Sequence, residues 1–454
     1  MLAQPDGGVL VAAAAGDQIA LARFLADGAP DGLFGAGGVA LRDPSGGGGL
    51  PPGSGPAAIA AISSGQIVVA GSVGVATDDY ESGEQIVVGR FSDRGLPDPG
   101  FGHDGFAVFQ LGASSPQAHA ASAARALAVL ADGRIVIAGR ATDRSGSERA
   151  FVARLTAAGR LDTSFGRGGR LLVQLGRASA RRRADSALNA LAVRADGALL
   201  AAGRATDVAG DDAVALARFT PQGALDAGYG RGGAVLSQLG TASAVAAPAS
   251  AARALVTTPA GDALVAGGAT GGALAARYGA GGRLDCGFGH SGRTLAYGGP
   301  GFDPAADGAA GALLAPDGGL VLAGRRARGG LLLGRLASGP PRAAPGGAAL
   351  STLAPRYSGH GRGFAYALVD GRCRSSIVRF VISAPGGRTI RTAAQRVPGA
   401  AGPRVVCAPL RGLRRGVRYR VRVTSTAKGG PHGRQRTLGA VAPAVPALPQ
   451  EGCV

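Results

Sequence analysis

The sequence predicts an all-β protein in which a six-bladed β-propeller, built from four-stranded repeats of roughly 60 residues, precedes a small, very basic β-sandwich. Three observations lead to this prediction. One pattern of apolar runs and turn residues recurs six times over residues 1–340. Each copy contains four short runs of the β type. Beyond residue 357 the spacing of the runs changes and positive charge becomes concentrated.

The clearest copy of the repeat extends from Ala124 to Gly176. Its first run, ALAVL, is followed by the dipeptide Asp132-Gly133 and a second run, RIVIAG. A DG pair between two β-type runs is a strong signal for a hairpin. After a polar loop come FVARL, the turn segment LDTSFGRGG over 161–169, and RLLVQL. This copy therefore predicts four antiparallel strands joined by short turns.

The same order of runs and turns recurs along the chain. The run after the hairpin glycine reads VLVAA, IVVAG, IVIAG, LLAAG, ALVAG and LVLAG in turn, and the third run always ends in arginine. The hairpin glycines are Gly7, Gly65, Gly133, Gly197, Gly261 and Gly318, and the arginines are Arg23, Arg90, Arg154, Arg218, Arg277 and Arg335. Runs that are apolar throughout indicate strands buried on both faces, which suits the stacked sheets of a propeller.

These repeats resemble the delta-60 repeat family of bacterial β-propellers, most closely at 132–139 and 161–169. The resemblance covers nearly all of residues 1–340 and implies a propeller in a secreted or cell-surface protein, without an established activity or known functional residues. The first and sixth copies depart from the pattern. Met1 aligns inside a first strand. The sixth copy continues into SGPPRAAPGG and lacks the turn segment that precedes the fourth strand in the other copies. Either the true start lies upstream, the reading we favour, or residues near 342–356 complete the ring.

A Pro/Gly/Ala-rich linker is expected over 341–356, a basic domain over 357–443 and a flexible tail over 444–454. The basic domain contains six β-type runs between Gly-rich turns, which suits an immunoglobulin-like sandwich. The runs are GFAYALV, SIVRFVIS, RTIRTAA, PRVVCAPL, VRYRVRVTST and RQRTLGAV. The segment from Leu413 to Gly430 resembles the closing strands of a fibronectin type III domain, which implies a packing role for Tyr419. Arg415 stands where that family has proline, and tryptophan is absent from the chain.

The net charge is strongly asymmetric. Residues 345–454 hold 17 arginines and one lysine against two acids, a net charge of +16, whereas residues 1–344 hold 30 arginines against 27 acids, a net charge of +3. Such asymmetry predicts an anionic partner, for which we consider a cell-wall polymer, a glycan or another protein. The alternative is a solvated face whose arginines reflect the codon usage of a GC-rich genome. We do not expect nucleic acid, because no recognition motif accompanies the charge.

Arginines cluster in the segment VRYRVRV and just before it. Because successive strand residues point to opposite faces, its three arginines share one face, where guanidinium groups are suited to bind phosphates or carboxylates. The candidate anion-binding residues are Arg411, Arg414, Arg415, Arg418, Arg420 and Arg422.

No pattern of catalytic or cofactor-binding residues is found, and we expect no cofactor, no metal and no catalytic residue. The repeated turn aspartates suggest a ring of calcium ligands, but we expect each to cap its own turn or pair with the recurrent arginine. These aspartates are Asp31, Asp98, Asp162, Asp226 and Asp285. The acids at 79, 81 and 84, and those at 207, 211 and 212, are expected to lie in solvated loops.

The four cysteines contain no CxxC pair, which argues against zinc. Cys373 and Cys407 lie in the same predicted domain and form a candidate disulfide in a secreted setting, whereas Cys286 is expected to be free. No run of 18 apolar residues is present, and Met1 is not followed by a signal-peptide pattern. The sequence leaves the oligomeric state open.

Together these features predict a non-enzymatic binding or scaffold protein, secreted or displayed at the cell surface. The alternative is a glycan hydrolase or lyase with carboxylates on loops at one mouth of the propeller.

Overall fold

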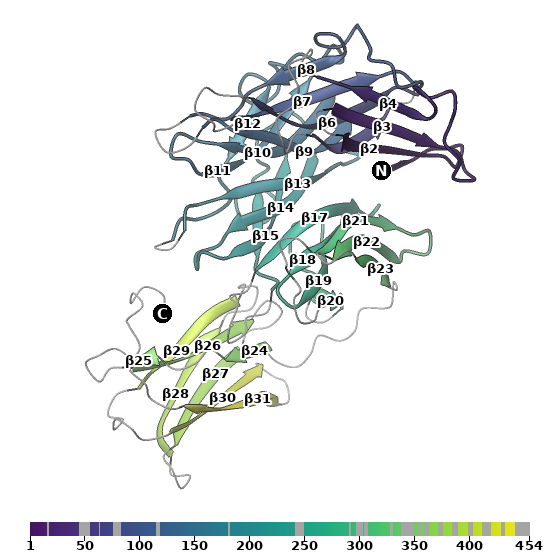
Figure 1. Ribbon diagram of the computed structural model, residues 1–454. Coiled ribbons are helices and arrows are strands. Elements are labelled where there is room, and N and C mark those ends of the chain that lie inside the picture. The colour runs from purple at the N-terminus through teal and green to yellow at the C-terminus, as the bar shows by residue number, and fades with distance from the viewer. Residues whose placement is uncertain are drawn as a thin grey trace. The chain divides into compact units, whose positions relative to one another are not determined.

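The computed structural model describes residues 1–15, 18–44, 55–62, 64–75, 83–114, 119–179, 182–240, 249–289, 292–296, 303, 307–326 and 330–336, and the strands beyond 348, mostly as backbone. In these residues the chain forms six successive antiparallel sheets, seen in chain order from purple to green in Figure 1. The first five sheets have four strands each and the sixth has three described strands. The predicted all-β propeller of four-stranded blades is confirmed.

The strands of each blade follow the predicted runs. Blades 1 to 3 consist of β1 (Leu2–Ala3), β2 (Val9–Ala15), β3 (Gln18–Phe24) and β4 (Val39–Arg42); β5 (Gly55–Ala61), β6 (Ile67–Val75), β7 (Gly83–Phe91) and β8 (Phe106–Phe109); and β9 (Ser122–Val129), β10 (Ile135–Thr142), β11 (Glu148–Leu155) and β12 (Arg170–Val173). Blades 4 to 6 consist of β13 (Ser186–Val193), β14 (Leu199–Thr206), β15 (Asp212–Phe219) and β16 (Ala234–Ser237); β17 (Ser250–Thr257), β18 (Ala263–Ala269), β19 (Gly272–Tyr278) and β20 (Arg293–Ala296); and β21 (Gly308–Leu314), β22 (Leu320–Arg326) and β23 (Gly330–Leu336).

The Asp-Gly hairpin explains how the first two strands of a blade are joined. In blade 3 the backbone N–H of Arg134 donates to Asp132 Oδ1 at 3.1 Å, and Gly133 takes a φ of 81°. A positive φ is readily accessible only to glycine, so the turn requires this residue. Strand β10 then pairs with β9 on one side and with β11 on the other.

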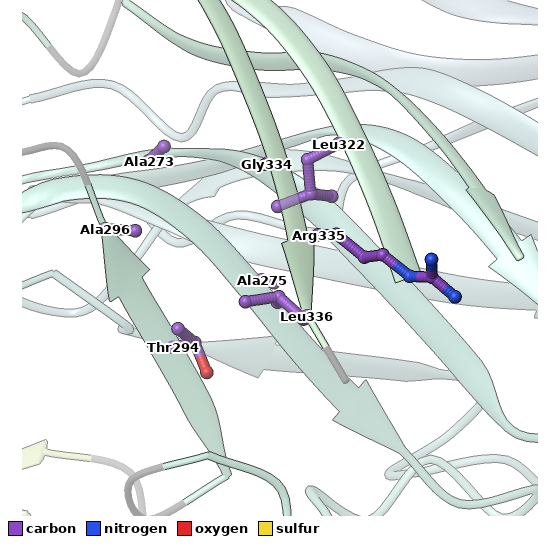
Figure 2. A pocket seen from close by; sticks show the side chains of 8 residues that line it. All are labelled: Ala273, Ala275, Thr294, Ala296, Leu322, Gly334, Arg335 and Leu336. Carbon is purple, nitrogen blue, oxygen red and sulfur yellow. The ribbon is translucent and has the colours of Figure 1, made fainter. Parts of the chain in front are cut away.

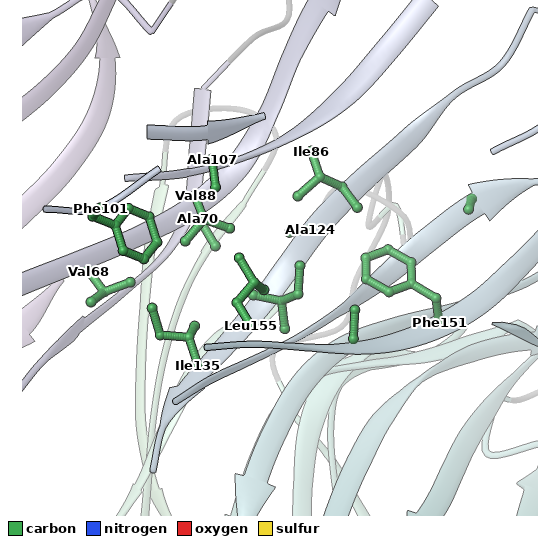
Figure 3. Close-up of a cluster of buried hydrophobic side chains, with 13 residues drawn as sticks. Val68, Ala70, Ile86, Val88, Phe101, Ala107, Ala124, Ile135, Phe151 and Leu155 are labelled. Atoms are coloured by element: carbon green, nitrogen blue, oxygen red, sulfur yellow. The ribbon is translucent and has the colours of Figure 1, made fainter. Parts of the chain in front are cut away.

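The core of the propeller lies between adjacent blades. Figure 3 shows one such cluster. Val68 and Val88 of blade 2, with Phe101 of the turn between β7 and β8, pack against Ile135 and Leu155 of blade 3. All five side chains are completely buried. Because each middle strand is covered on both faces, its sequence is apolar throughout, as in IVIAG, and does not alternate.

A β-bulge interrupts the first strand of several blades. In blade 3, Ala138 pairs with Ala126 but its neighbour Gly139 pairs with Ala124, so Arg125 is the extra residue. The same shift makes Asn189 the extra residue of blade 4. A bulge turns its extra side chain away from the regular alternation of the strand. The equivalent extra residues in blades 2 and 6 are Ala57 and Ala310.

The region after residue 348 forms two further antiparallel sheets. One has the order β28-β27-β30-β31, and the other joins β24, β25 and β29 to β26. Their strands are β24 (Ala349–Thr352), β25 (Arg356–Tyr357), β26 (Gly363–Asp370), β27 (Ser376–Ser383), β28 (Thr389–Val397), β29 (Pro403–Leu410), β30 (Tyr419–Ala427) and β31 (His432–Ala440). Each of the six expected runs coincides with a strand, while the immunoglobulin-like arrangement stays a prediction.

Part of the segment considered for ring closure has another partner. Residues 349–352 form β24, which pairs with β26, and residues 356–357 form β25, which pairs with the same strand. Residues 349–352 and 356 of the expected linker are therefore engaged in the C-terminal sheets rather than in a blade. Residues 342–348 lie outside the described part of the chain. In the described residues no helix is long and apolar enough to cross a membrane.

Candidate functional site

In blades 2 to 5 the repeated arginine, aspartate and aromatic residue form one structural cluster. In blade 3, Arg154 Nε lies 2.7 Å from Asp162 Oδ2, and the guanidinium lies over the ring of Phe165, 4.7 Å from its centroid. Arg154 Nη1 also donates to the carbonyl of Pro221 in the next blade at 2.8 Å. The same arginine–aromatic contact recurs as Arg90–Phe101, Arg218–Tyr229 and Arg277–Phe288.

Each turn aspartate caps its own turn, as expected, and is not arranged as a metal ligand. Asp162 Oδ1 accepts from the backbone N–H and the hydroxyl of Ser164, at 3.1 and 2.6 Å. The Ser164 hydroxyl, followed by Arg154, lowers the pKa of Asp162 from 3.8 to about 2. Caps of the same kind occur at Asp31, Asp98, Asp226 and Asp285. Among the residues with described side chains, no group of three or more His, Cys, Asp or Glu could hold a metal ion.

A chain of four alternating charges crosses blades 2, 3 and 4. Arg140 on β10 binds Glu84 Oε2 through Nη2 at 2.6 Å and Glu148 Oε1 through Nη1 at 2.9 Å. Arg204 on β14 binds the other oxygen of Glu148 at 2.5 Å. The four side chains are only 21–23% exposed. Glu84, expected in a solvated loop, instead lies in β7, and that expectation is wrong.

The available signal for this ion chain was the repeat alignment. Arg140 and Arg204 both follow the glycine of the second strand in the segment GRAT, and Glu84 and Glu148 both lie six residues before the recurrent arginine of the third strand. Partners that lie 56 residues apart meet only because successive blades stack. Acids 79 and 81 lie outside the described residues.

The extra residues of the bulges form a second polar group beside the ion chain. Arg125 Nη1 donates to Asn189 Oδ1 at 3.1 Å, and Asn189 Nδ2 donates to the carbonyl of Ala252 at 2.8 Å. Arg253 holds the same sequence position in β17 that Arg125 holds in β9. Burial lowers the pKa of Arg125, and the neighbouring charge of Arg140 lowers it further. The pattern of a single strand does not reveal these residues, because their contacts join different blades.

The alternative enzymatic reading requires two carboxylates that converge on a substrate. Among the described residues, Glu84 and Glu148 each bind a guanidinium, and the carboxylate of Asp185 accepts from the backbone N–H of Glu148. Both glutamate side chains are therefore engaged in ion pairs rather than presented together to a substrate.

A small cavity lies between blades 5 and 6, as shown in Figure 2. It is lined mainly by small or apolar side chains, among them Ala273, Ala275 and Leu322, with Thr294 and Arg335. Its volume of about 50 Å³ has room for a water-sized molecule. Ligand sites typically enclose about 300–1,000 Å³, so this cavity is a packing defect rather than a binding pocket.

The structure places only part of the predicted arginine cluster. Arg420 and Arg422 lie in β30, with side chains that are not described, whereas Arg411, Arg414, Arg415 and Arg418 lie outside the described residues. Cys407 lies in β29, and Cys373 lies outside the described residues, so their pairing stays a prediction. Cys286 is disulfide-bonded, and the expectation of a free thiol is wrong.

Comparison with known proteins agrees with the repeated sheets. A family model described as a domain of unknown function (DUF5122) beta-propeller matches residues 4–34, 130–165 and 194–229, in blades 1, 3 and 4. No curated protein matches the chain. A crystal structure of a xylan β-1,4-xylosidase from Bacillus halodurans C-125 aligns with 10% identity over 86% of this chain and 90% of that chain, at a TM-score of 0.26, too low to support a shared fold or activity. The chain is thus a six-bladed β-propeller whose repeats resemble those of the DUF5122 propeller family.

Proposed function

We propose that the protein is a non-enzymatic binding or scaffold protein, secreted or displayed at the cell surface. In this proposal the propeller is a rigid platform, and the basic C-terminal sheets contact an anionic cell-wall polymer, a glycan or an acidic protein. The charge distribution supports the assignment, because residues 345–454 carry a net charge of +16. A surface of one sign raises the local concentration of a polymer of the opposite sign.

The observation that carries the proposal is the register of the sheet β28-β27-β30-β31. Arg422 pairs with Val381, Arg420 with Ser383, and Thr424 with Arg379. Residues directly opposite one another in neighbouring strands share a face, so Arg379, Arg420 and Arg422 belong to one face of the sheet.

The neighbouring strand β28 extends this basic face. Arg396 pairs with Ile377, which lies two residues from Arg379 in β27 and therefore on the same face. The side chain of Arg379 is exposed, as is Ala394, which lies opposite it in β28. The exposure of both residues supports a solvent-facing surface with four arginine positions. Its opposite face carries Phe380, between Val423 and Ala393 in the register.

Salt-dependent retention tests the proposal. The full chain and the variant Arg379→Ser/Arg420→Ser/Arg422→Ser are applied to immobilised polyphosphate and eluted with rising NaCl. We expect the variant to elute at clearly lower salt, because each lost phosphate contact removes about one released counterion from the binding equilibrium.

A matched control separates a local face from overall charge. The variant Arg144→Ser/Arg167→Ser/Arg183→Ser removes three exposed arginines from the propeller and the same net charge. It is expected to elute close to the unaltered protein. Equal shifts for the two triple variants would mean that retention follows net charge alone, and the proposed binding face would be rejected.

A further inference from the structure

The residue at the bulge position of the first strand differs in type between copies of the repeat. This position holds alanine in blades 2 and 6, at Ala57 and Ala310, but a polar side chain in blades 3 and 4, at Arg125 and Asn189. Arg253 holds the equivalent sequence position in blade 5. Alanine is therefore sufficient to form the bulge. The bulge itself therefore does not require the polar residues, and bulges commonly re-aim side chains beside binding sites.

These three residues lie on neighbouring strands of one compact unit. The first strands β9 and β13 contact each other, and the Asn189 amide reaches the backbone of β17. Asn189 uses its oxygen to accept from Arg125 and its nitrogen to donate to Ala252, at 3.1 and 2.8 Å. The amide is thus held at both ends and fixes Nη1 of Arg125. Among the described residues, the Nε and Nη2 groups of Arg125 have no hydrogen-bond partner.

The local charge is unbalanced at Arg125. In the adjacent ion chain, the two arginines Arg140 and Arg204 are matched by the two glutamates Glu84 and Glu148. Arg125 adds a positive charge to this neutral group, and no described carboxylate lies within ion-pair distance of it. A partly buried guanidinium is costly unless an anion compensates it.

We propose that Arg125, positioned by Asn189 and accompanied by Arg253, forms a binding site for a carboxylate group on the propeller. The planar edge formed by Nε and Nη2 offers two parallel N–H donors, and this fork matches the two oxygens of a carboxylate. The carboxylate belongs to a small acidic solute, either a sugar acid or an acidic amino-acid side chain. The site is separate from the basic face of the C-terminal sheets and does not depend on it.

Calorimetric titration of the full chain tests the ligand class. Four compounds are titrated separately. Galacturonate and acetyl-glutamate amide supply the two kinds of carboxylate, galactose is the uncharged control for galacturonate, and inorganic phosphate is the control for a tetrahedral anion. At least one carboxylate is expected to bind with a saturable heat, and the responding compound identifies the source. Absence of saturable binding by both carboxylates, or binding of phosphate at least as tight, would overturn the proposal.

Variants locate the binding at Arg125 rather than on the basic C-terminal face. Arg125→Gln is expected to weaken carboxylate binding by at least about tenfold, and Arg125→Lys, which keeps the charge but lacks the fork, to weaken it measurably. Arg379→Ser/Arg420→Ser/Arg422→Ser should bind like the unaltered protein. Unchanged binding by Arg125→Gln, or its loss in the triple variant alone, would overturn the site while leaving the proposed function of the basic face intact.

A third variant keeps the test decisive if Arg125→Gln does not fold. Asn189→Asp places a carboxylate beside Nη1 of Arg125 and should compensate the charge of the guanidinium from within the chain. It is expected to weaken carboxylate binding at the Nε–Nη2 edge while the thermal unfolding transition is retained. Binding by Asn189→Asp that equals that of the unaltered protein contradicts the assignment.

Discussion

At the scale of single residues, the recurrent arginine of blade 3 combines interactions that no other side chain could replace. Arg154 is 8% exposed and binds Asp162, Ser164 and the carbonyl of Pro221 through three different nitrogens. Its guanidinium also stacks on Phe165. This fixed fork joins the third strand to its own turn and to the next blade, which lysine could not do at this position.

The substitution Arg154→Lys should therefore be destabilising although it keeps the charge. A lysine ammonium is a point charge without the planar fork, so it cannot reproduce three hydrogen bonds and the stacking at once. We expect the free energy of unfolding to fall by about 2–3 kcal/mol in urea titrations.

Arg335→Lys is the control for this substitution. Arg335 occupies the same repeat position in blade 6, but its side chain is 57% exposed and its partner Asp317 is 60% exposed. Exposed ion pairs contribute about 0–1 kcal/mol, so this variant should lose little stability. Equal losses at the two positions would show that burial and the fork do not set the cost.

At the scale of the strand, a glycine and a bulge depend on each other. A Cβ placed on Gly203 of β14 would lie 1.9 Å from the carbonyl oxygen of Ala187 in β13. The corresponding distance is 1.9 Å at Gly139 and 2.0 Å at Gly71 and Gly324. The bulge brings the first strand so close to the second that only glycine fits opposite it. The glycine that ends IVVAG, IVIAG, LLAAG and LVLAG is thus a condition for presenting Arg125 and Asn189.

Gly203→Ala should disturb blade 4 through this contact. Because the clashing atom is backbone, the strands must separate, and we expect the free energy of unfolding to fall by about 2–3 kcal/mol. Thermal and urea unfolding measure the loss. Gly32→Ala is the matched control, since nothing lies within 4 Å of a Cβ at Gly32. A similar loss at Gly32 would indicate a general cost of replacing glycine and contradict the close approach.

Strands and turns were predictable from the sequence because their signals are local and are repeated six times. The Asp132-Gly133 hairpin and the apolar run after it need no distant partner to be recognised. The candidate site was not predictable in the same way. The Arg125–Asn189 contact joins residues 64 positions apart and depends on a one-residue bulge, which leaves no trace in the alternation of a single strand. Glu84 was misplaced because β7 begins at Gly83, earlier than its apolar run.

At the scale of the whole molecule, polar bonds between blades add to the buried apolar core. Gly102 donates to the carbonyl of Ala158 and Gly166 to that of Gln222, in each case from one blade to the next. The ion chain through Glu148 couples three blades in the same direction. In a repeat protein, such contacts between neighbours mean that unfolding of one repeat lowers the stability of the next.

Glu148→Gln tests whether this coupling is energetic as well as geometric. The substitution leaves Arg140 and Arg204 without their shared carboxylate while the shape of the side chain is kept. Removing one member of a fully buried pair costs about 3–5 kcal/mol, and for groups exposed by about a fifth we expect roughly 2 kcal/mol. Amide hydrogen exchange should accelerate together in β7, β10 and β14, which belong to three different blades.

Asp132→Asn, which breaks a half-exposed pair with Arg134, is the control. It should cost less than about 1 kcal/mol and should not accelerate exchange in neighbouring blades. Faster exchange confined to blade 3 in Glu148→Gln would mean that the blades open independently, and the ion chain would then be a local feature rather than a link between blades.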